Sequence, residues 1–321
     1  MSGNGPGGWR NLVFKAGRVR PTLRALVFLP ALGGAGLGIG LLVLMALGVL
    51  GTQPLAASAF PSERVIEAGG PPTLILPVAA LLFYLVLVLL GTLAFRRLLD
   101  GRSFTSLGFH RARGWLADTL FGLVLGLALM SLITAAEWGM GWLQIRGFVW
   151  ETRPAAVVWL SLGYSLWQFV VVAINEETMS RGYILQNLEE DWGVKVAVVS
   201  SSVVFGLLHS ANPNVSALAL FNLFVAGLLF AYGYTATRQL WLPIALHFSW
   251  NFFQGPVFGF PVSGGAGQGL LVTSVNGPDL ITGGAFGPEG GLIGLGAMVV
   301  GIGAIWGWGM RGHRGLEGST T

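Results

Sequence analysis

The chain contains eight apolar stretches, each near the length that a helix needs to cross a lipid bilayer. A membrane-spanning helix takes about 20 mostly apolar residues. The stretches cover residues 25–51, 73–95, 116–136, 155–177 with a polar continuation to 190, 194–210, 215–237, 240–258 and 289–309. The pattern predicts an all-α, polytopic membrane protein with about eight transmembrane helices.

Composition supports the membrane class and excludes several kinds of site. Of the 321 residues, 53% are hydrophobic and 10% are charged, whereas soluble domains carry about 25% charged residues. Basic and aromatic residues are not interleaved as nucleic-acid binding requires, so we expect membrane lipids and no nucleic acid as partners. The chain has no cysteine, which removes disulfides, thiolate metal sites and cysteine nucleophiles.

Basic residues in short loops mark the cytoplasmic side of a membrane protein. One set of connections is rich in them, and the opposite loops hold only Arg64, Arg146 and Arg153. The rich set contains Arg10, Lys15, Arg18, Arg20, Arg24, Arg96, Arg97, Arg102, Arg111, Arg113, Arg238, Arg311 and Arg314. We therefore predict that both termini are cytoplasmic. The glycine- and alanine-rich composition favours a prokaryotic plasma membrane.

Charged residues interrupt the fourth stretch, where a charge near the centre of a span costs roughly 2.5–3.5 kcal/mol and is usually functional. Glu177 and Arg181 are four residues apart, so they share a helix face with the acid first, the favoured order for an ion pair. Glu176 points about 100° away from Glu177 and has no local partner. The structural alternative is a charge cluster at the end of a helix.

The fourth and fifth stretches are predicted to form a hairpin whose turn contains Trp192. Glu176 lies 16 residues before Trp192, and His209 lies 17 residues after it. At 1.5 Å per residue, the carboxylate and the imidazole reach nearly the same depth, roughly 24–25 Å from the turn. Phe205, one turn before His209, is expected to pack beside it.

The seventh stretch carries His247 and Asn251, four residues apart on one helix face. A lone histidine in an apolar helix is more often a satisfied buried donor than a ligand. Polar groups in hydrocarbon need partners, however, and the polar residues of three helices are natural partners for one another. Counting from Arg238 places His247 nearer the cytoplasmic surface than His209, so a tilted or broken helix, or a re-entrant segment near 211–214, is needed to bring them level.

These residue types support hydrolysis at a carbonyl group, and a peptide bond is the substrate that they favour. A carboxylate beside an imidazole can hold a water molecule and remove its proton. An imidazole and an amide four residues apart can donate to one developing oxyanion. Alternatively, Glu176, His209 and His247 bind a divalent metal such as zinc, which would activate a bound water. The chain lacks His-Glu-x-x-His, which excludes a zincin-type helix.

Together the three motifs resemble those of the CAAX protease and bacteriocin-processing family, also called CPBP or Abi, which includes type II CAAX prenyl endopeptidases. The resemblance covers about residues 115–255 and implies an eight-helix intramembrane endopeptidase with a cavity open toward the cytoplasm. The matching motifs are Glu176-Glu177-x-x-x-Arg181, Phe205-x-x-x-His209 and His247-x-x-x-Asn251.

The resemblance also implies a role for each polar residue. Glu176 and His209 would activate water, and His247 with Asn251 would stabilise the oxyanion. Glu177 and Arg181 would support the site. The family carries the name metalloprotease, but its eukaryotic relatives look like glutamate-dependent enzymes, so the cofactor is either zinc or none.

The expected organisation has five segments. They are a basic disordered or interfacial leader (1–24), the N-terminal transmembrane helices with a cytoplasmic loop (25–114), the protease-like core (115–258), a glycine-rich loop (259–288), and the last transmembrane helix with a cytoplasmic tail (289–321).

The substrate class predicted for the enzyme is a membrane-anchored protein or peptide, including a C-terminally lipidated one. Two other functions compete with a protease: a non-catalytic membrane scaffold or bacteriocin-immunity protein, and a proton-coupled transporter. The intact polar residues disfavour a scaffold, and the lack of an internal repeat disfavours a transporter.

Overall fold

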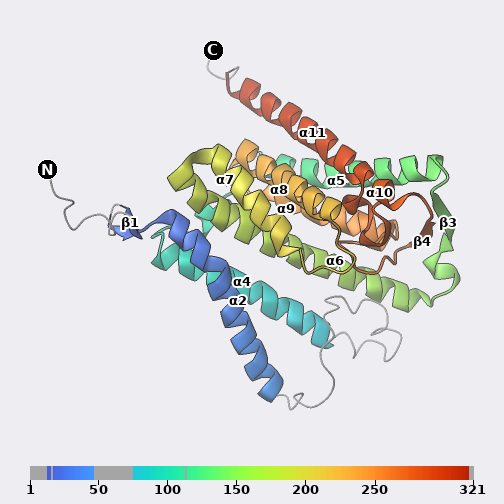
Figure 1. Ribbon diagram of the computed structural model, residues 1–321, viewed down its shortest axis with the longest axis horizontal. Coiled ribbons are helices and arrows are strands. Elements are labelled where there is room, and N and C mark those ends of the chain that lie inside the picture. The colour runs from blue at the N-terminus through green and yellow to red at the C-terminus, as the bar shows by residue number, and fades with distance from the viewer. Residues whose placement is uncertain (1–12, 16, 47–74, 113, 318–321) are drawn as a thin grey trace.

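The computed structural model describes residues 13–15, 17–46, 75–112 and 114–317. These residues form a bundle of helices with two small two-stranded sheets, one toward each end (Figure 1). The long helices are α2 (Pro21–Ala46), α4 (Ile75–Leu98), α5 (Trp115–Gly139), α6 (Ala155–Glu177), α7 (Gln186–Leu208), α8 (Ala217–Thr237), α9 (Trp241–Phe252) and α11 (Leu292–Glu317).

Each predicted apolar stretch overlaps one of these helices, and residues 47–51 of the first stretch and 73–74 of the second lie outside the described residues. Five helical segments among the described residues are long and apolar enough to cross a membrane, where the sequence predicted about eight spans. They are Pro77–Leu98, Trp115–Gly139, Ala155–Leu208, Ala217–Thr237 and Leu292–Met310. The protein is therefore a polytopic membrane protein. The number differs in part because α9 has only 12 residues.

The predicted fourth and fifth spans are joined in one helical run of 54 residues, Ala155–Leu208. A straight helix of this length would measure about 81 Å, far more than the hydrocarbon thickness of about 30 Å. Gly193 breaks the run with non-helical φ 78° and ψ 164°, and the chain turns back there (Figure 1). The break lies beside Trp192, where the hairpin turn was predicted.

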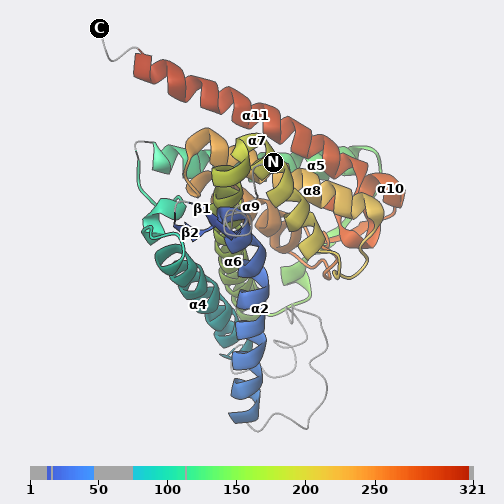
Figure 2. The same cartoon turned by 60° about the vertical axis from the view of Figure 1, so that its left-hand side comes forward.

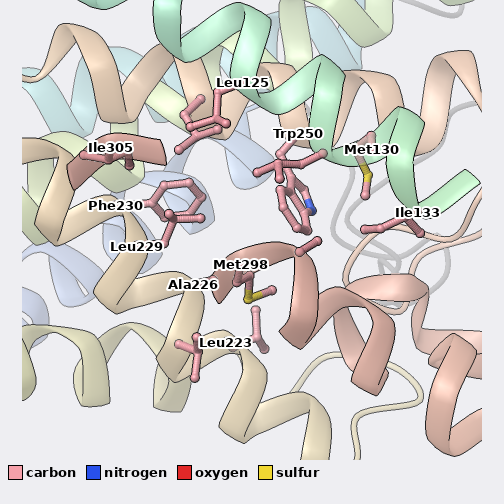
Figure 3. Close-up of a cluster of buried hydrophobic side chains, with 14 of the residues drawn as sticks. Leu125, Met130, Ile133, Leu223, Ala226, Leu229, Phe230, Trp250, Met298 and Ile305 are labelled. Atoms are coloured by element: carbon pink, nitrogen blue, oxygen red, sulfur yellow. The ribbon is translucent and has the colours of Figure 1, made fainter. Parts of the chain in front are cut away.

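Helices α5 and α9 lie in backbone contact because glycines line their interface. A Cβ atom on Gly122 would lie 2.6 Å from the Leu242 carbonyl oxygen, and one on Gly126 would lie 2.6 Å from Ser249 Cβ. Small residues allow this close approach between membrane helices. The buried apolar core then extends from α5 and α9 to α8 and α11 (Figure 3), and its members include Leu125, Met130, Leu229, Phe230, Trp250, Met298 and Ile305.

Helices α2 and α4 form a separate pair that leans against the bundle and diverges from it (Figure 2). Buried Asp100 ties the pair to the bundle at one end. Its carboxylate accepts hydrogen bonds from Arg24 at 3.1 Å and Arg96 at 3.0 Å, with longer ones from Tyr183 and Asn187 at 3.4 Å. Four donors from three parts of the chain therefore share one buried carboxylate.

The described part of the basic leader forms a short strand pair before α2. Strands β1 (Phe14–Lys15) and β2 (Arg18–Val19) pair with each other. The Lys15 ammonium lies 2.8 Å from the Asp191 carboxylate at the turn between α6 and α7. This ion pair and the hydrogen bonds of Thr22 to Asp191 fix the start of α2.

The segment expected to be a glycine-rich loop contains strand β4 (Leu271–Val275) and the short helix α10 (Asp279–Thr282). Strand β4 pairs antiparallel with β3 (Leu143–Phe148), which precedes α6. The fold is therefore mostly helical and not all-α. The strand has a physical basis, since β-branched residues dominate β4 and fit a half-buried pleated surface.

Candidate active site

The polar residues of α6, α7 and α9 meet at a cavity of about 1000 Å³ inside the helix bundle. Its walls include Glu176, His209, His247 and Asn251. The remaining walls are mainly apolar and come from the core helices, from the α2 and α4 pair, and from the glycine-rich segment. The structure thus brings together the four side chains that the sequence singled out.

Helix α6 ends at Glu177 and continues as an eight-residue π-helix, Thr178–Leu185. π-Helical turns are rare and often occur at functional sites. The predicted ion pair lies across the junction, with Arg181 Nη1 3.0 Å from Glu177 Oε1 and both side chains fully buried. Arg181 Nη2 also donates to the Gly227 carbonyl on α8 at 2.8 Å.

Aromatic rings enclose the Arg181 guanidinium. Its Cζ atom lies 4.5 Å from the centroid of Phe205 and 5.3 Å from that of Phe230. Both distances are within the range of a cation–π interaction, which strengthens where water is excluded. Phe205 packs beside His209 as expected, with ring centroids 4.8 Å apart, and it also borders the guanidinium.

His247 is oriented by Glu177 and Phe230. Its Nδ1 atom lies 2.9 Å from Glu177 Oε1, and its ring stacks on Phe230 with centroids 4.7 Å apart and planes 13° apart. A carboxylate without a proton can only accept, so the hydrogen bond places a proton on Nδ1. The opposite ring atom, Nε2, lies 3.9 Å from Glu176 Oε2.

His209 is the first residue after α7 and caps its C-terminus. Its Nδ1 atom lies 2.8 Å from the Phe205 carbonyl oxygen. A carbonyl oxygen only accepts, so this nitrogen also carries a proton and Nε2 is left for other interactions. His209 Nε2 lies 3.8 Å from Glu176 Oε2.

Glu176 Oε2 is the point where the two imidazoles converge. The atom is buried and makes no hydrogen bond to the described residues. Its distances to the two Nε2 atoms differ by only 0.1 Å, 3.8 against 3.9 Å. Both imidazoles therefore reach the same carboxylate oxygen. Asn251, one turn after His247, lines the same cavity.

The comparisons with known proteins agree with this geometry. The family model described as "Type II CAAX prenyl endopeptidase Rce1-like" matches residues 157–253, which include all three motifs. Residues 157–253 therefore form an Rce1-like domain. No curated protein and no solved structure gives a significant match. A domain of this kind implies an intramembrane protease that acts on membrane proteins or peptides.

The alternative of a metal held by the Rce1-like domain does not fit the donor geometry. Among the residues that the structure describes, no group of three or more His, Cys, Asp or Glu side chains is arranged to hold a metal ion. Oxygen and nitrogen ligands at 2.0–2.1 Å from a tetrahedral zinc lie about 3.3–3.5 Å from each other. Glu176 Oε2 lies farther than that from both His209 Nε2 and His247 Nε2.

Sequence reasoning missed Glu289, which lies after the matched domain and reaches the same cavity. The carboxyl group is buried and bonds Ser263 of the glycine-rich segment. A signal was available in the sequence, because Glu289 is the one charged residue between Asp279 and Arg311. Charged residues isolated in apolar segments of membrane proteins are usually functional.

Proposed function

We propose that the protein is an intramembrane endopeptidase that hydrolyses a peptide bond of a membrane-anchored protein or peptide. The observation that carries the proposal is the convergence of Glu176 Oε2 with His209 Nε2 and His247 Nε2, at 3.8 and 3.9 Å, on the wall of a large cavity. The match of residues 157–253 to the Rce1-like family supports it.

In the proposed reaction, Glu176 and His209 activate the attacking water. Their facing atoms are 3.8 Å apart, too far for a direct hydrogen bond, and one water can lie about 2.8 Å from both. With its Nδ1–H donated to the Phe205 carbonyl, neutral His209 offers a lone pair at Nε2. The water donates a proton to this pair of acceptors as its oxygen attacks the peptide carbonyl carbon.

His247 and Asn251 would stabilise the oxyanion that this attack creates. The Glu177 carboxylate accepts from His247 Nδ1 and favours the protonated imidazole, whose Nε2–H then faces the reacting centre. Asn251, one turn later, supplies an amide N–H toward the same cavity. Donors fixed in place before the reaction stabilise developing charge without reorganisation. When the C–N bond breaks, the amine leaving group takes back the proton held by Glu176 and His209.

The walls of the cavity favour a substrate with an apolar anchor. Helix α2 contributes Leu29 and Leu32, and helix α4 contributes Leu87 and Val88. A volume of about 1000 Å³ is at the upper end for small-molecule sites, which run from about 300 to about 1000 Å³. A peptide segment together with part of its membrane anchor fits such a space.

A cleavage assay tests the proposal. Purified protein in detergent would be offered quenched fluorescent peptides, prenylated and unmodified, and a panel of transmembrane peptides. We expect Glu176→Ala and His209→Ala each to lower kcat/KM by about 10²–10⁴-fold, the usual contribution of general acid–base groups. The matched control is Glu190→Gln, because Glu190 is exposed and pairs with Arg102 far from the cavity wall.

The assay has a clear contrary outcome. Cleavage at the wild-type rate by both Glu176→Ala and His209→Ala would show that these two residues do not activate the attacking water. Repeating the assay with a chelator separates metal-dependent hydrolysis from carboxylate-dependent hydrolysis. The carboxylate mechanism predicts no loss of rate.

A further inference from the structure

Glu289 is a buried carboxyl group that reaches the site from outside the matched domain. It lies in the turn between α10 and α11 and is 4% exposed. The α8 residue Asn222 fixes the backbone of this turn by donating to the Glu289 carbonyl at 2.8 Å and the Gly291 carbonyl at 2.7 Å. The side chain of Glu289 is therefore held in one place from which it points toward the cavity.

The Glu289 carboxylate holds the glycine-rich segment at Ser263. Its Oε1 atom accepts from the Ser263 backbone N–H at 2.5 Å and from the Ser263 hydroxyl at 2.7 Å. Ser263 has φ +49°, a left-handed conformation that non-glycine residues rarely adopt. Such a conformation persists only where the surroundings impose it. The two hydrogen bonds to Glu289 are such a constraint.

The segment held by Glu289 in turn holds the chain that follows His209. Asn212 Nδ2 donates to the Ser263 carbonyl at 3.0 Å, and the Asn212 backbone N–H donates to the His209 carbonyl at 3.0 Å. Packing is tight here, since a Cβ atom on Gly264 would lie 1.8 Å from the Pro213 carbonyl oxygen. A continuous path of hydrogen bonds thus runs from Glu289 through Ser263 and Asn212 to His209.

His209 depends on this path because it lies where α7 ends. Its φ of −95° and ψ of 4° are outside the helical region, and its backbone N–H bonds the Gly206 carbonyl, three residues back. The imidazole is tied to α7 by its Nδ1 bond to the Phe205 carbonyl, and the turn that follows holds the backbone from which the ring extends. A displacement of 1 Å at a reacting group can cost about 10²-fold in rate.

We propose that Glu289 is a positioning residue for His209, acting through Ser263 and Asn212. The catalytic consequence rests on the proposed function, whereas the mechanical link between Glu289 and the turn after His209 does not. The link needs a hydrogen-bond acceptor at residue 289 and no charge. Burial raises the pKa of the Glu289 carboxyl above its usual value, so charge and acceptor roles must be separated by experiment.

Two substitutions separate these roles. Glu289→Gln keeps an oxygen that can accept from Ser263 and removes the charge, so the turn and kcat should stay near wild type. Glu289→Ala removes the acceptor, and kcat should fall about tenfold or more with KM within about twofold, because geometry and not binding is lost. Asn212→Ala should have the same effect as Glu289→Ala.

The closing experiment combines kinetics with hydrogen exchange. In Glu289→Ala, the amides of Ser210 and Asn212 should exchange faster than in wild type, while in Glu289→Gln they should not. The double variant Glu289→Ala/Asn212→Ala should lose no more activity than the worse single variant, as residues on one path are not additive. Glu190→Gln is the control for both measurements.

The outcomes distinguish this proposal from the protease assignment. Unchanged exchange at Ser210 and Asn212 in a folded Glu289→Ala protein would overturn the positioning role, as would multiplying losses in the double variant. If the wild-type protein cleaves no peptide, the protease assignment fails, and the exchange measurement still decides whether Glu289 holds the turn.

Discussion

At the residue scale, Arg181 is the charge on which the polar cluster depends. The guanidinium is fully buried and neutralises Glu177, which in turn bonds His247. Breaking a buried ion pair from one side leaves an uncompensated charge away from water. Arg181 is therefore expected to matter for stability as well as for the orientation of the imidazole.

Replacing Arg181 by methionine tests this dependence. Arg181→Met should lower the free energy of unfolding by about 3–5 kcal/mol, the usual cost of stranding one member of a buried pair. The double variant Glu177→Gln/Arg181→Met should recover part of the loss, because it also removes the stranded carboxylate. Unfolding would be followed by circular dichroism in detergent.

The matched control is the exposed pair of Arg238 and Glu189. Its nitrogen–oxygen distance of 2.8 Å is as short, but the Arg238 side chain is 54% exposed. Exposed pairs contribute about 0–1 kcal/mol, so Arg238→Met should be nearly neutral. Equal losses from the two arginine variants would show that burial does not decide the cost.

A pH dependence is predicted for Glu289. Burial raises the pKa of its carboxyl in the folded protein above the unfolded value. The stability linked to a raised pKa is fully present below the unfolded pKa and is lost as the pH rises through the folded pKa. As the pH rises above the unfolded value of 4.5, the Tm of wild type should therefore fall relative to that of Glu289→Gln. A Tm difference that grows in favour of wild type as the pH rises would contradict this.

At the element scale, the contact between α5 and α9 sets the position of His247. Gly122 and Gly126 leave no room for a side chain between the two backbones. Helix α9 carries His247 and Asn251 and is only 12 residues long. A short helix wedged against α5 has little freedom to accommodate a shift, so α5 controls the site although it lies outside the matched residues 157–253.

Gly126→Ala tests this control. The new Cβ would lie 2.6 Å from Ser249 Cβ, so α9 must move, at a cost of about 1–3 kcal/mol for overpacking. We expect kcat/KM to fall about tenfold or more as His247 leaves its position. Gly163→Ala on α6 is the control, since nothing lies within 4 Å of its added Cβ, and it should be neutral or stabilise by about 0.5–1 kcal/mol. Equal activities for the two variants would show that α5 does not control the position of His247.

The elements that the sequence predicted well are those with a long-range apolar pattern. All eight helices lie where the apolar stretches placed them, and the four-residue spacing of Glu177 and Arg181 predicted their ion pair. The π-helix was missed because i to i+5 bonding leaves no periodic apolar signal over eight residues. The pairing of β3 with β4 was missed because the strands are more than 120 residues apart, and only tertiary structure brings them together.

The same limit explains which parts of the site were predictable. Three motifs in three apolar stretches pointed to Glu176, His209 and His247, since polar groups within apolar stretches are visible in the sequence. Glu289 and Ser263, which are in contact, are 26 residues apart in the sequence, and the segment between them has no periodic pattern. No spacing rule links two residues of such a segment, so Glu289 could be noticed as an isolated charge but not assigned a partner.

At the scale of the whole molecule, ion pairs hold together several segments that connect helices and were predicted to be cytoplasmic, at one end of the bundle. Near the turn between α6 and α7, three acidic residues each bind a basic residue from another connection. The pairs are Lys15–Asp191, Arg102–Glu190 and Arg238–Glu189. Four separate connections therefore lie on the same side, as the distribution of basic residues requires. Strands β3 and β4 lie at the opposite end of α6 (Figure 1).

This arrangement predicts the orientation of the protein in its membrane, and the lack of cysteine makes the test direct. Thr152 and Lys195 are exposed residues, Thr152 just before α6 and Lys195 just after the break at Gly193 where the chain turns back. In intact cells, a membrane-impermeant maleimide should label Thr152→Cys and not Lys195→Cys, because the positive-inside rule places the basic end in the cytoplasm. Permeabilised cells should label both, and the cysteine-free parent should label under neither condition. Labelling of Lys195→Cys alone in intact cells would show that the topology is inverted. The cavity would then open toward the other side of the membrane, where a cytoplasmic substrate could not reach it.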